Sequence, residues 1–453
     1  MKFTLSWLKD FLDTSATLQE ITDKLTAIGL EVESVEDPAK TLEGFVVGHV
    51  VSAAKHPDAD KLQCLVVDTG TEKLNVVCGA PNARADMKGV FAPVGSYIPG
   101  SDMTLKKGVI RGQESNGMMC SERELELSEE HTGIIELPET AATGSSAAAA
   151  LGLDDPVIEI NLTPNRGDCA GIYGIARDLA AAGLGTLRPI AATPVTATFD
   201  NPIVVSIEDE KNCPLFIGRY IRGVKNGASP EWLQKRLKAI GQNPISVLVD
   251  ITNYMTIALN RPLHVFDADK LQGNIRVRAA KNGEKLEALN DKTYALQDGM
   301  TAVCDDSGVL GLGGIIGGVP SSVTGETVNV YLEVALFDTV RTAMTGQKLQ
   351  IDSDARYRFE RGIDPAFAQD GAEFATQMII DLCGGEASSL SRAGKAPAEA
   401  QTVAYSPARL KVLGGMELPE ARQKAILTAL GFGVTDSGKA WSVTVPSWRS
   451  DIH

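Results

Sequence analysis

Between residues 39 and 150 the sequence consists of short runs of β-branched residues, and this feature restricts the possible fold more than any other. The runs are VVGHVVSAAKHP, KLQCLVVDTG, KLNVVCGA and GVFAPVGSYIPG, and Gly, Pro and Asp separate them. Several strands at this spacing are typical of a small β-barrel or a β-sandwich. The pattern therefore predicts an all-β module inside the chain.

The segments on either side of this module each contain a helical pattern. In residues 1–38, apolar residues recur at helical spacing in two stretches, and the second predicted helix begins at Ser15 or Thr17 and ends at Gly29. Residues 151–190 predict a strand, a turn and a helix, and a linker rich in Pro, Ala and Thr follows.

Residues 203–390 form the longest block, and predicted helices and strands alternate within it. The segment SPEWLQKRLKAIG predicts an amphipathic helix capped by Ser229. The sequence from about residue 402 predicts two helices and a strand. A chain of 453 residues is long enough for three or four domains. The expected fold class is therefore α+β multidomain.

Composition excludes several classes of function. Asp and Glu number 58 against 43 Lys and Arg, a formal charge of −15, so the chain is not a bulk electrostatic binder of nucleic acid. Contact with RNA would need local patches or recognition of an end or a shape. No apolar stretch is long enough to predict a membrane span. The seven cysteines form no CxxC, which argues against a disulfide framework or a zinc knuckle and predicts a reduced, cytoplasmic protein.

Two polar motifs interrupt the predicted all-β module, and each has a functional and a structural interpretation. The run HPDADKL (56–62) is either an RNA-backbone or metal contact or an Asp/Pro turn with solvated charges, and the spacing alone favours the turn. The run RGQESNGMMCSERELEL (111–127) is best interpreted as a loop that closes a barrel.

The glycine-rich run GLGGIIGG (311–318) fails the GxGxxG pattern, and the chain has no GxxxxGK[ST], which disfavours a nucleotide-binding loop. Close approach to a ligand and tight packing of two turns remain open. A lone histidine such as His264 is more often structural than catalytic, but Thr252, Asn253 and Asp267 are nearby in sequence. The run RYRFERGID (356–364) indicates a buried ion-pair network.

Taken together, these segments resemble the family of bacterial phenylalanyl-tRNA synthetase β subunits. The similarity covers essentially the whole chain in collinear order. The motifs that carry it are MKFTLSWLKDF, HPDADKL, VVCGAPN, RGQESNGMMCSERELEL, NLTPNRGDC, GIARDLAA, DITNYM, RPLHVFDADKL, GGIIGG, LEVALFD, RYRFERGIDP and VPSWRSDI. Chains of this family are longer, so the resemblance implies an N-terminal fragment.

The resemblance implies four domains. Residues 1–38 plus 152–190 would form an N-terminal α+β domain, split by an OB-fold tRNA-binding β-barrel at 39–150. Residues 203–390 would form an α/β editing domain of the B3/B4 type, and 402–453 the start of a B5-type, winged-helix-like domain. Members of the family work as (αβ)2 heterotetramers on tRNA(Phe), with ATP-dependent aminoacylation in the α subunit.

The resemblance also implies hydrolytic editing of mischarged Tyr-tRNA(Phe). An apolar pocket rejects the extra hydroxyl of tyrosine by only about a hundredfold, whereas a carboxylate accepts a hydrogen bond from a phenol. We expect His264 and Glu333, with Thr252 and Asn253, to form the catalytic site and Gly318 to leave room for the ring. Alternation in YLEVALFD predicts that Glu333 is buried.

Asp451, in the run SWRSDI, is the residue that the resemblance assigns to magnesium. The site would be shared with the α subunit and completed by residues beyond this chain, because magnesium commonly takes only one or two protein carboxylates. Two other functions remain as alternatives. One is a tRNA-binding or assembly scaffold without hydrolytic activity, and the other is a free-standing sugar- or nucleotide-binding protein.

Overall fold

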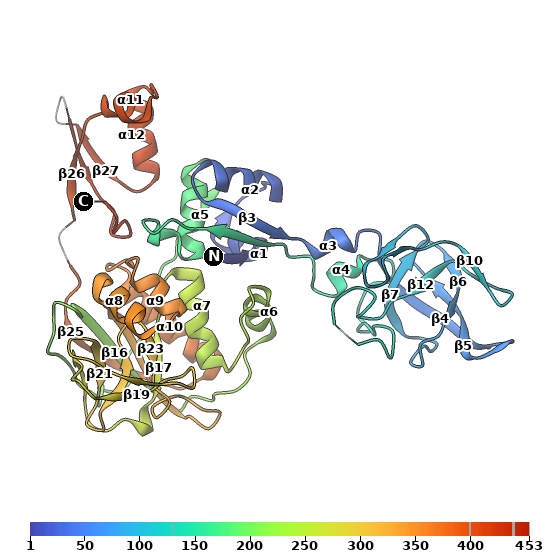
Figure 1. Ribbon diagram of the computed structural model, residues 1–453, viewed down its shortest axis with the longest axis horizontal. Coiled ribbons are helices and arrows are strands. Elements are labelled where there is room, and N and C mark those ends of the chain that lie inside the picture. The colour runs from blue at the N-terminus through green and yellow to red at the C-terminus, as the bar shows by residue number, and fades with distance from the viewer. Residues whose placement is uncertain (129, 398–399, 437–439, 453) are drawn as a thin grey trace. The chain divides into compact units, whose positions relative to one another are not determined.

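The computed structural model describes residues 1–128, 130–397, 400–436 and 440–452, and the predicted domain end at residue 453 lies outside them. The chain divides into two compact units (Figure 1). One unit is continuous, Val35–Ile158, and the other combines Met1–Ser34 with Glu159–His453. The finer division into four domains stays a prediction.

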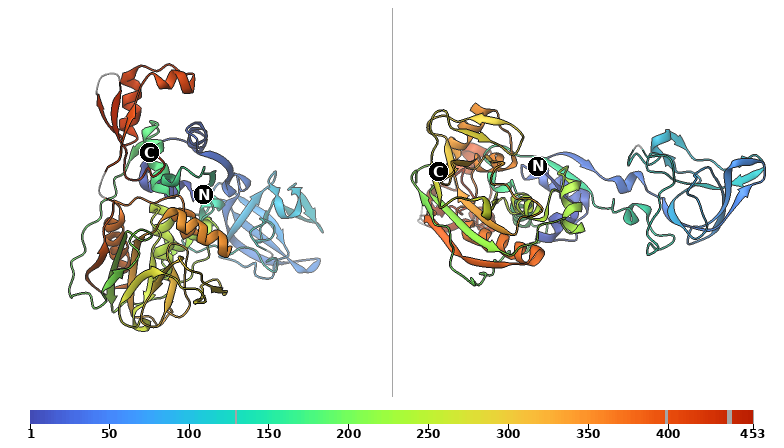
Figure 2. Two further views of the ribbon diagram at one scale, coloured as in Figure 1. Left: turned by 60° about the vertical axis from the view of Figure 1, so that its left-hand side comes forward. Right: turned by 90° about the horizontal axis from the view of Figure 1, so that it is seen from below.

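The continuous unit is a near-closed barrel of five antiparallel strands in the order β12-β7-β4-β5-β6, and its curvature is visible in Figure 2. The strands are β4 (Val46–His56), β5 (Ala59–Asp68), β6 (Lys73–Cys78), β7 (Lys88–Pro93) and β12 (Gly117–Met119). The edge strands meet where the Asn116 N–H donates to the Asn75 carbonyl (2.8 Å) and the Val77 N–H to Ser115 Oγ (3.1 Å). Strand spacing left a barrel and a sandwich open, and the structure shows the barrel that the family resemblance implied.

Shorter elements complete this unit. They are α3 (Pro38–Thr41), β8 (Tyr97–Ile98), η1 (Pro99–Ser101), β9 (Met103–Thr104), β10 (Gly108–Ile110), β11 (Gln113–Ser115) and α4 (Ala147–Ala150). The run HPDADKL spans the end of β4, a two-residue turn and the start of β5. The His56 ring is buried there, with Nε2 3.0 Å from the Ile110 carbonyl and Nδ1 accepting the Asp58 N–H (3.1 Å).

The other unit begins with small helices packed beside short strands. These elements are β1 (Lys2–Thr4), α1 (Leu5–Phe11), β2 (Leu12–Asp13), α2 (Leu18–Ala27), β3 (Glu31–Glu36), β13 (Val157–Asn161), η2 (Gly167–Cys169), α5 (Ile172–Ala181) and β14 (Thr186–Leu187). Thr17 caps α2 in a capping box with Glu20, and Gly29 follows at φ +89°, so both predicted ends of this helix are confirmed.

Two sheets dominate the residues that follow. One has the order β15-β18-β21-β22-β23 and the other β17-β24-β16-β25. Their strands are β15 (Val205–Ile207), β16 (Leu215–Arg222), β17 (His264–Asp267), β18 (Ile275–Ala279), β21 (Thr301–Cys304), β22 (Val309–Leu312), β23 (Ile316–Gly317), β24 (Asn329–Leu336) and β25 (Glu386–Gly394), with a separate pair β19 (Lys285–Glu287) and β20 (Thr293–Ala295).

Helices cover the second of these sheets, because α10 packs across β16 and β24, and α7 packs on α10. The helices of this region are α6 (Glu231–Ala239), α7 (Val247–Leu259), η3 (Ala268–Lys270), α8 (Thr339–Leu349), α9 (Asp354–Phe359) and α10 (Ala368–Cys383). The predicted Ser229 cap of α6 is wrong. Pro230 occupies the cap position, and the Ser229 hydroxyl donates instead to the Asp250 carboxylate.

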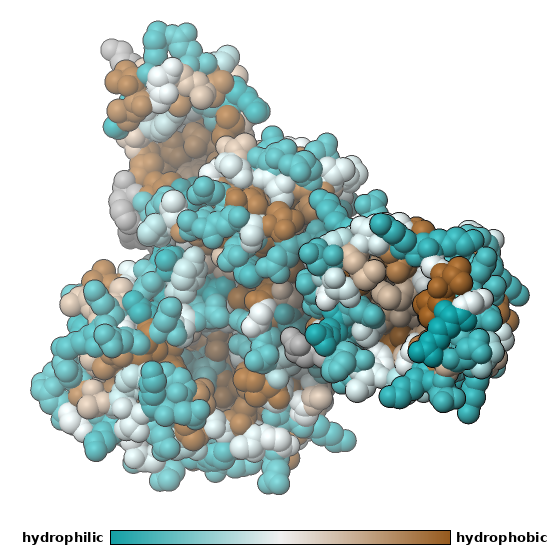
Figure 3. All heavy atoms as spheres, turned by 45° about the vertical axis from the view of Figure 1, so that its right-hand side comes forward, coloured by the Kyte–Doolittle hydropathy of each residue, from teal (hydrophilic) through white to brown (hydrophobic). Residues whose placement is uncertain are grey.

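The last segment contains β26 (Thr402–Tyr405), α11 (Arg409–Gly414), α12 (Glu420–Ala429), β27 (Gly433–Asp436) and β28 (Trp441–Thr444). Its antiparallel sheet has the order β26-β28-β27, so two strands join the predicted helix–helix–strand pattern. On the face shown in Figure 3 hydrophilic residues predominate, and hydrophobic ones form separate patches. Among the described residues, no helix combines the length and the apolar character that crossing a membrane requires.

Candidate active site between two sheets

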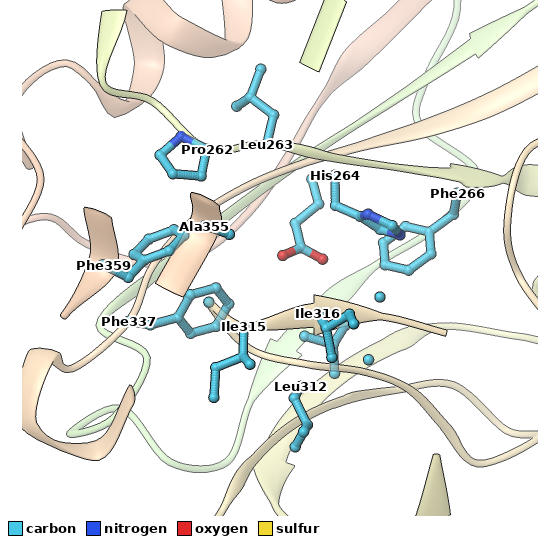
Figure 4. Close-up of a pocket in the computed structure, with 15 residues that line it drawn as sticks. Pro262, Leu263, His264, Phe266, Leu312, Ile315, Ile316, Phe337, Ala355 and Phe359 are labelled. Atoms are coloured by element: carbon cyan, nitrogen blue, oxygen red, sulfur yellow. The ribbon is translucent and has the colours of Figure 1, made fainter. Parts of the chain in front are cut away.

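The candidate site begins with one pair of residues in a β-ladder. Antiparallel pairing of β17 with β24 sets His264 directly opposite Glu333. Residues opposite each other in such a ladder project to the same face of the sheet. Both side chains accordingly line one cavity of about 140 Å³ between the two sheets (Figure 4).

Apolar and aromatic side chains form most of the cavity wall. In Figure 4 the rings of Phe337 and Phe359 lie together on one side, and His264 and Phe266 lie together on another. The ring centroids are 5.2 Å apart in the first pair and 4.4 Å apart in the second. The remaining lining residues are Pro262, Leu263, Val303, Gly311, Leu312, Gly314, Ile315, Ile316, Gly317 and Ala355. Such a wall suits a planar apolar ring.

Among the described residues that line this wall, Glu333 is the only acidic one, and it is 8% exposed. Among the described residues, no group donates a hydrogen bond to its carboxylate. Burial disfavours the charged form and raises the pKa of Glu333 to about 8. At neutral pH most of the population is therefore protonated, and a protonated carboxyl can both donate and accept a hydrogen bond.

The same low-polarity environment lowers the pKa of His264, whereas it raises the pKa of Glu333. Its Nε2 is shielded from solvent and has no partner among the described residues. Burial lowers the pKa of His264 to about 4, so the ring is neutral at pH 7. A neutral imidazole has one nitrogen free to accept a hydrogen bond, for example from water.

The glycine that faces His264 is Gly317, which sequence reasoning missed. A Cβ at Gly317 would lie 2.5 Å from His264 Cε1 and 2.9 Å from Nε2, so only glycine leaves this ring its position. The predicted residue Gly318 does not line the cavity, because its α-carbon faces the Leu310 carbonyl and Leu286. The many glycines of GLGGIIGG indicated a close approach in this run, but the sequence could not show whether Gly317 or Gly318 makes it.

Thr252 and Asn253 lie on α7 and are not among the residues that line the cavity. The Thr252 hydroxyl donates to the Val249 carbonyl within the same helix at 2.7 Å. The structure thus brings together His264 and Glu333 but not the other predicted site residues. The roles of Thr252, Asn253 and Gly318 stay predictions.

The Asp451 carboxylate forms an ion pair with the Arg449 guanidinium. Arg449 donates from Nε to Oδ1 (2.8 Å) and from Nη2 to Oδ2 (2.9 Å), and Asn165 Nδ2 lies 3.5 Å from Oδ2. Burial opposes ionisation of Asp451, but the hydrogen bonds from Arg449 outweigh it and hold its pKa below the ordinary value. In the described part of the chain Asp451 belongs to no group of three metal-ligating side chains. The residues present therefore do not by themselves fit a magnesium site.

Three family models match successive parts of the chain. The "Putative tRNA binding domain" matches residues 45–146, the "B3/4 domain" matches 212–384, and the "tRNA synthetase B5 domain" matches 403–453. The barrel thus falls in the first match and the His264–Glu333 cavity in the second. Together the fold and these matches define a component of an aminoacyl-tRNA synthetase.

Similarity to curated relatives shows which aminoacyl-tRNA synthetase family the chain resembles. "Phenylalanine--tRNA ligase beta subunit" of Paramagnetospirillum magneticum is 55% identical over 456 residues, and that of Ruegeria pomeroyi is 54% identical over 460 residues. The chain belongs to this family of bacterial-type phenylalanine--tRNA ligase β subunits. Each alignment covers 100% of this chain and 57% of the relative, so the chain spans little more than half the length of either.

One solved structure is a more distant match. It is an N-terminal fragment of the phenylalanyl-tRNA synthetase β subunit from Pyrococcus horikoshii, with 16% identity and a TM-score of 0.34, over 66% of this chain and 84% of that one. A likeness at that level is too remote to extend the assignment.

Proposed function

We propose that this chain is the part of a phenylalanine--tRNA ligase β subunit that binds tRNA(Phe) and hydrolyses mischarged Tyr-tRNA(Phe). The observation that carries the proposal is the placement of His264 and Glu333 on one apolar cavity. The aromatic wall holds the ring of the amino acid, and the buried Glu333 carboxyl pairs with the phenol hydroxyl.

Selection of tyrosine over phenylalanine follows from the burial of Glu333. A phenylalanyl group would leave this buried carboxyl without a partner. Sites that hydrogen-bond a substrate hydroxyl disfavour the analogue without it by a factor of about 10⁴–10⁵. The site therefore removes the error and leaves correctly charged tRNA intact.

Hydrolysis of the ester needs an oriented water more than a strong nucleophile. The neutral His264 ring accepts a hydrogen bond from the water, whose oxygen adds to the ester carbonyl carbon. The bond between that carbon and the ribose oxygen then breaks, and a proton from the water ends on the ribose oxygen. Tyrosine and tRNA are the products, and no further reactant is consumed.

The test uses the complete ligase with the change Glu333→Ala. Charging with phenylalanine should be unchanged, while Tyr-tRNA(Phe), measured by radiolabelled tyrosine, should accumulate by about a hundredfold or more, because hydrolysis loses its selective contact. Glu287→Ala, at an exposed position on β19, is the matched control and should behave as the wild type.

His264→Ala provides the second arm of this experiment and should also release Tyr-tRNA(Phe). If neither Glu333→Ala nor His264→Ala changes the deacylation rate, the chain is a tRNA-binding scaffold without hydrolytic activity.

The remaining parts of the proposal concern partners. An α subunit would complete an (αβ)2 heterotetramer in the cytoplasm and use ATP for aminoacylation, as family membership implies. The unit that holds the barrel would contact tRNA through local cations. The chain carries a net charge of −15, and the segments that flank β10 expose Lys106, Lys107 and Arg111. The three strands and two helices of the last segment support a winged-helix-like domain.

Magnesium belongs to this proposal only in the heterotetramer, because Asp451 is paired with Arg449 here. In the complete enzyme Asp451→Ala should lower the bound magnesium, measured by metal analysis of dialysed protein, or weaken α–β assembly, measured by sedimentation. Unchanged metal content together with unchanged assembly would remove Asp451 from the magnesium site.

A further inference from the structure

A second cavity, of about 240 Å³, lies in the unit that also holds the His264–Glu333 cavity, and the two share no lining residue. Its walls come from α5, from the end of α7 with Arg261, and from the first turn of α10. None of the functions derived above uses it. Its most unusual wall residue is Arg261, in the motif RPLHVFDADKL.

The Arg261 guanidinium is fully buried, at 0% exposure. Its Nη2 donates to the Asp364 carbonyl, but Nε and Nη1 have no partner among the described residues. Burial lowers the pKa of Arg261 to about 10, which leaves the group charged at pH 7. Burying a charge with unsatisfied donors is unfavourable, so such a group is expected to meet an acceptor.

Gly371 on α10 makes room for this arginine. A Cβ at Gly371 would lie 3.0 Å from Arg261 Cγ, closer than ordinary van der Waals contact. Helix α10 therefore leaves room for the aliphatic part of Arg261. The surrounding fold holds this side chain, and so its unpartnered Nε and Nη1, in place.

Two more residues of this wall each carry a shielded polar atom without a partner. Arg177 Nε has no partner among the described residues, and its guanidinium lies 4.2 Å from the centre of the Trp448 ring. Asn260 Oδ1 is also unpartnered, while its Nδ2 donates to the Gly167 carbonyl at 2.9 Å. The rest of the wall includes Leu259 and Phe367. The wall residues thus combine unsatisfied donors on Arg261 and Arg177 and one unsatisfied acceptor on Asn260 with apolar and aromatic surface.

We propose that this cavity binds a small organic carboxylate with an apolar or aromatic body, its carboxylate accepting hydrogen bonds from Arg261. A multiply charged anion such as phosphate fits poorly, because Asp168, Asp364 and Asp370 also line the cavity. A ligand with a single negative charge suits a wall that carries both arginines and aspartates. The exposed Asp370 can in addition meet an ammonium group, so an α-amino acid carries the same recognition chemistry.

The test is calorimetric titration of the 453-residue chain with two probes, 3-phenylpropanoate and L-phenylalanine. Arg261→Lys keeps the charge but loses the planar fork and should weaken binding by about tenfold or more. Ile190→Trp fills the cavity from a half-exposed wall position without touching its polar groups, and it should weaken both probes equally. Thermal unfolding of each variant shows whether its fold is kept.

Asp370→Asn separates the two sources of the carboxylate. If the variant loses binding of L-phenylalanine but keeps binding of 3-phenylpropanoate, the natural ligand is an amino acid. If the variant binds both probes as the wild type does, the natural ligand is a simple carboxylate. A crystal soaked with the tighter probe should show its carboxylate at Arg261. The proposal is overturned if neither probe binds saturably, if Ile190→Trp leaves binding intact, or if the soaked crystal holds only ordered water at Nε and Nη1.

Discussion

At the scale of single residues, burial shifts the pKa values of Glu333 and His264 in opposite directions. Both shifts favour the neutral form of the side chain. Loss of solvation disfavours whichever form of a group is charged, so it raises the pKa of the carboxyl to about 8 and lowers the pKa of the imidazole to about 4. In the proposed function, two neutral partners would let the apolar cavity hold an aromatic ring without an uncompensated charge. A polar hydroxyl would then be the feature that the cavity distinguishes.

These shifts predict how stability depends on pH. Because the folded chain holds the Glu333 proton more tightly than the unfolded chain, its contribution to the free energy of unfolding is present below about pH 4.5 and is lost as pH rises to about 8. Glu333→Gln removes this dependence and should be more stable than wild type at pH 8, by up to a few kcal/mol at about 1.4 kcal/mol per pKa unit. Urea unfolding at several pH values measures the difference.

The control for this prediction is Glu287→Gln, which changes an exposed carboxyl on β19 and should leave the pH curve of the wild type unaltered. A Glu333→Gln curve parallel to the wild type from pH 5 to 8 would show that Glu333 titrates normally.

At the scale of elements, the β22–β23 hairpin places two adjacent glycines in different environments. Gly317 approaches a side chain across the cavity, whereas Gly318 approaches the backbone of β22. A side chain can rotate away from an added methyl group, but a carbonyl in a β-ladder cannot move without losing its hydrogen bonds. The two positions should therefore respond differently to the same substitution.

Gly317→Ala should displace the His264 ring, whose Cε1 lies 2.5 Å from the added carbon, and lower the deacylation rate about tenfold or more with little change in unfolding temperature. Gly318→Ala meets the Leu310 carbonyl at 2.6 Å and should destabilise the fold by roughly 1–3 kcal/mol. Deacylation assays and thermal denaturation of both variants give the comparison. Equal effects on both measurements would refute the assignment of Gly317 to the His264 side of the hairpin.

At the scale of the whole molecule, the seven cysteines are all free thiols, and all except Cys64 are buried. Burial raises the pKa of Cys304 and of Cys383 to about 11, which suppresses the reactive thiolate. Cys78, Cys120 and Cys304 belong to three separate apolar clusters, whereas Cys169 accepts a hydrogen bond from Arg166.

A thiol reagent at pH 8 should consequently label one cysteine rapidly in the native chain and all seven in urea. Mass spectrometry of digested protein should locate the fast site at Cys64, and Cys64→Ser should abolish the fast phase. Cys304→Ser, at a buried site, should retain it. A second rapidly labelled cysteine would contradict the burial described here.

Local chemistry was enough to predict many elements and part of the site. The Thr17 cap and Gly29 end of α2 depend on neighbouring residues alone. The predicted burial of Glu333 is confirmed, although nearly all of β24 is buried instead of alternating. Ser229 shows the limit of such reasoning, since its hydroxyl suits a helix cap but donates to Asp250, twenty-one positions away. A local preference yields when a buried carboxylate supplies a stronger partner.

By itself, the sequence determined that residues 39–150 are rich in strands, that helices and strands alternate in the longest block, and that Glu333 is buried. The tertiary structure alone decided that His264 lies opposite Glu333 in the ladder, that Gly317 rather than Gly318 faces the His264 ring, and that Arg449 donates hydrogen bonds to Asp451. The physical reason is range. Strand period and helix caps act over a few residues, whereas register between strands and the pairing of buried charges depend on segments that only folding brings together.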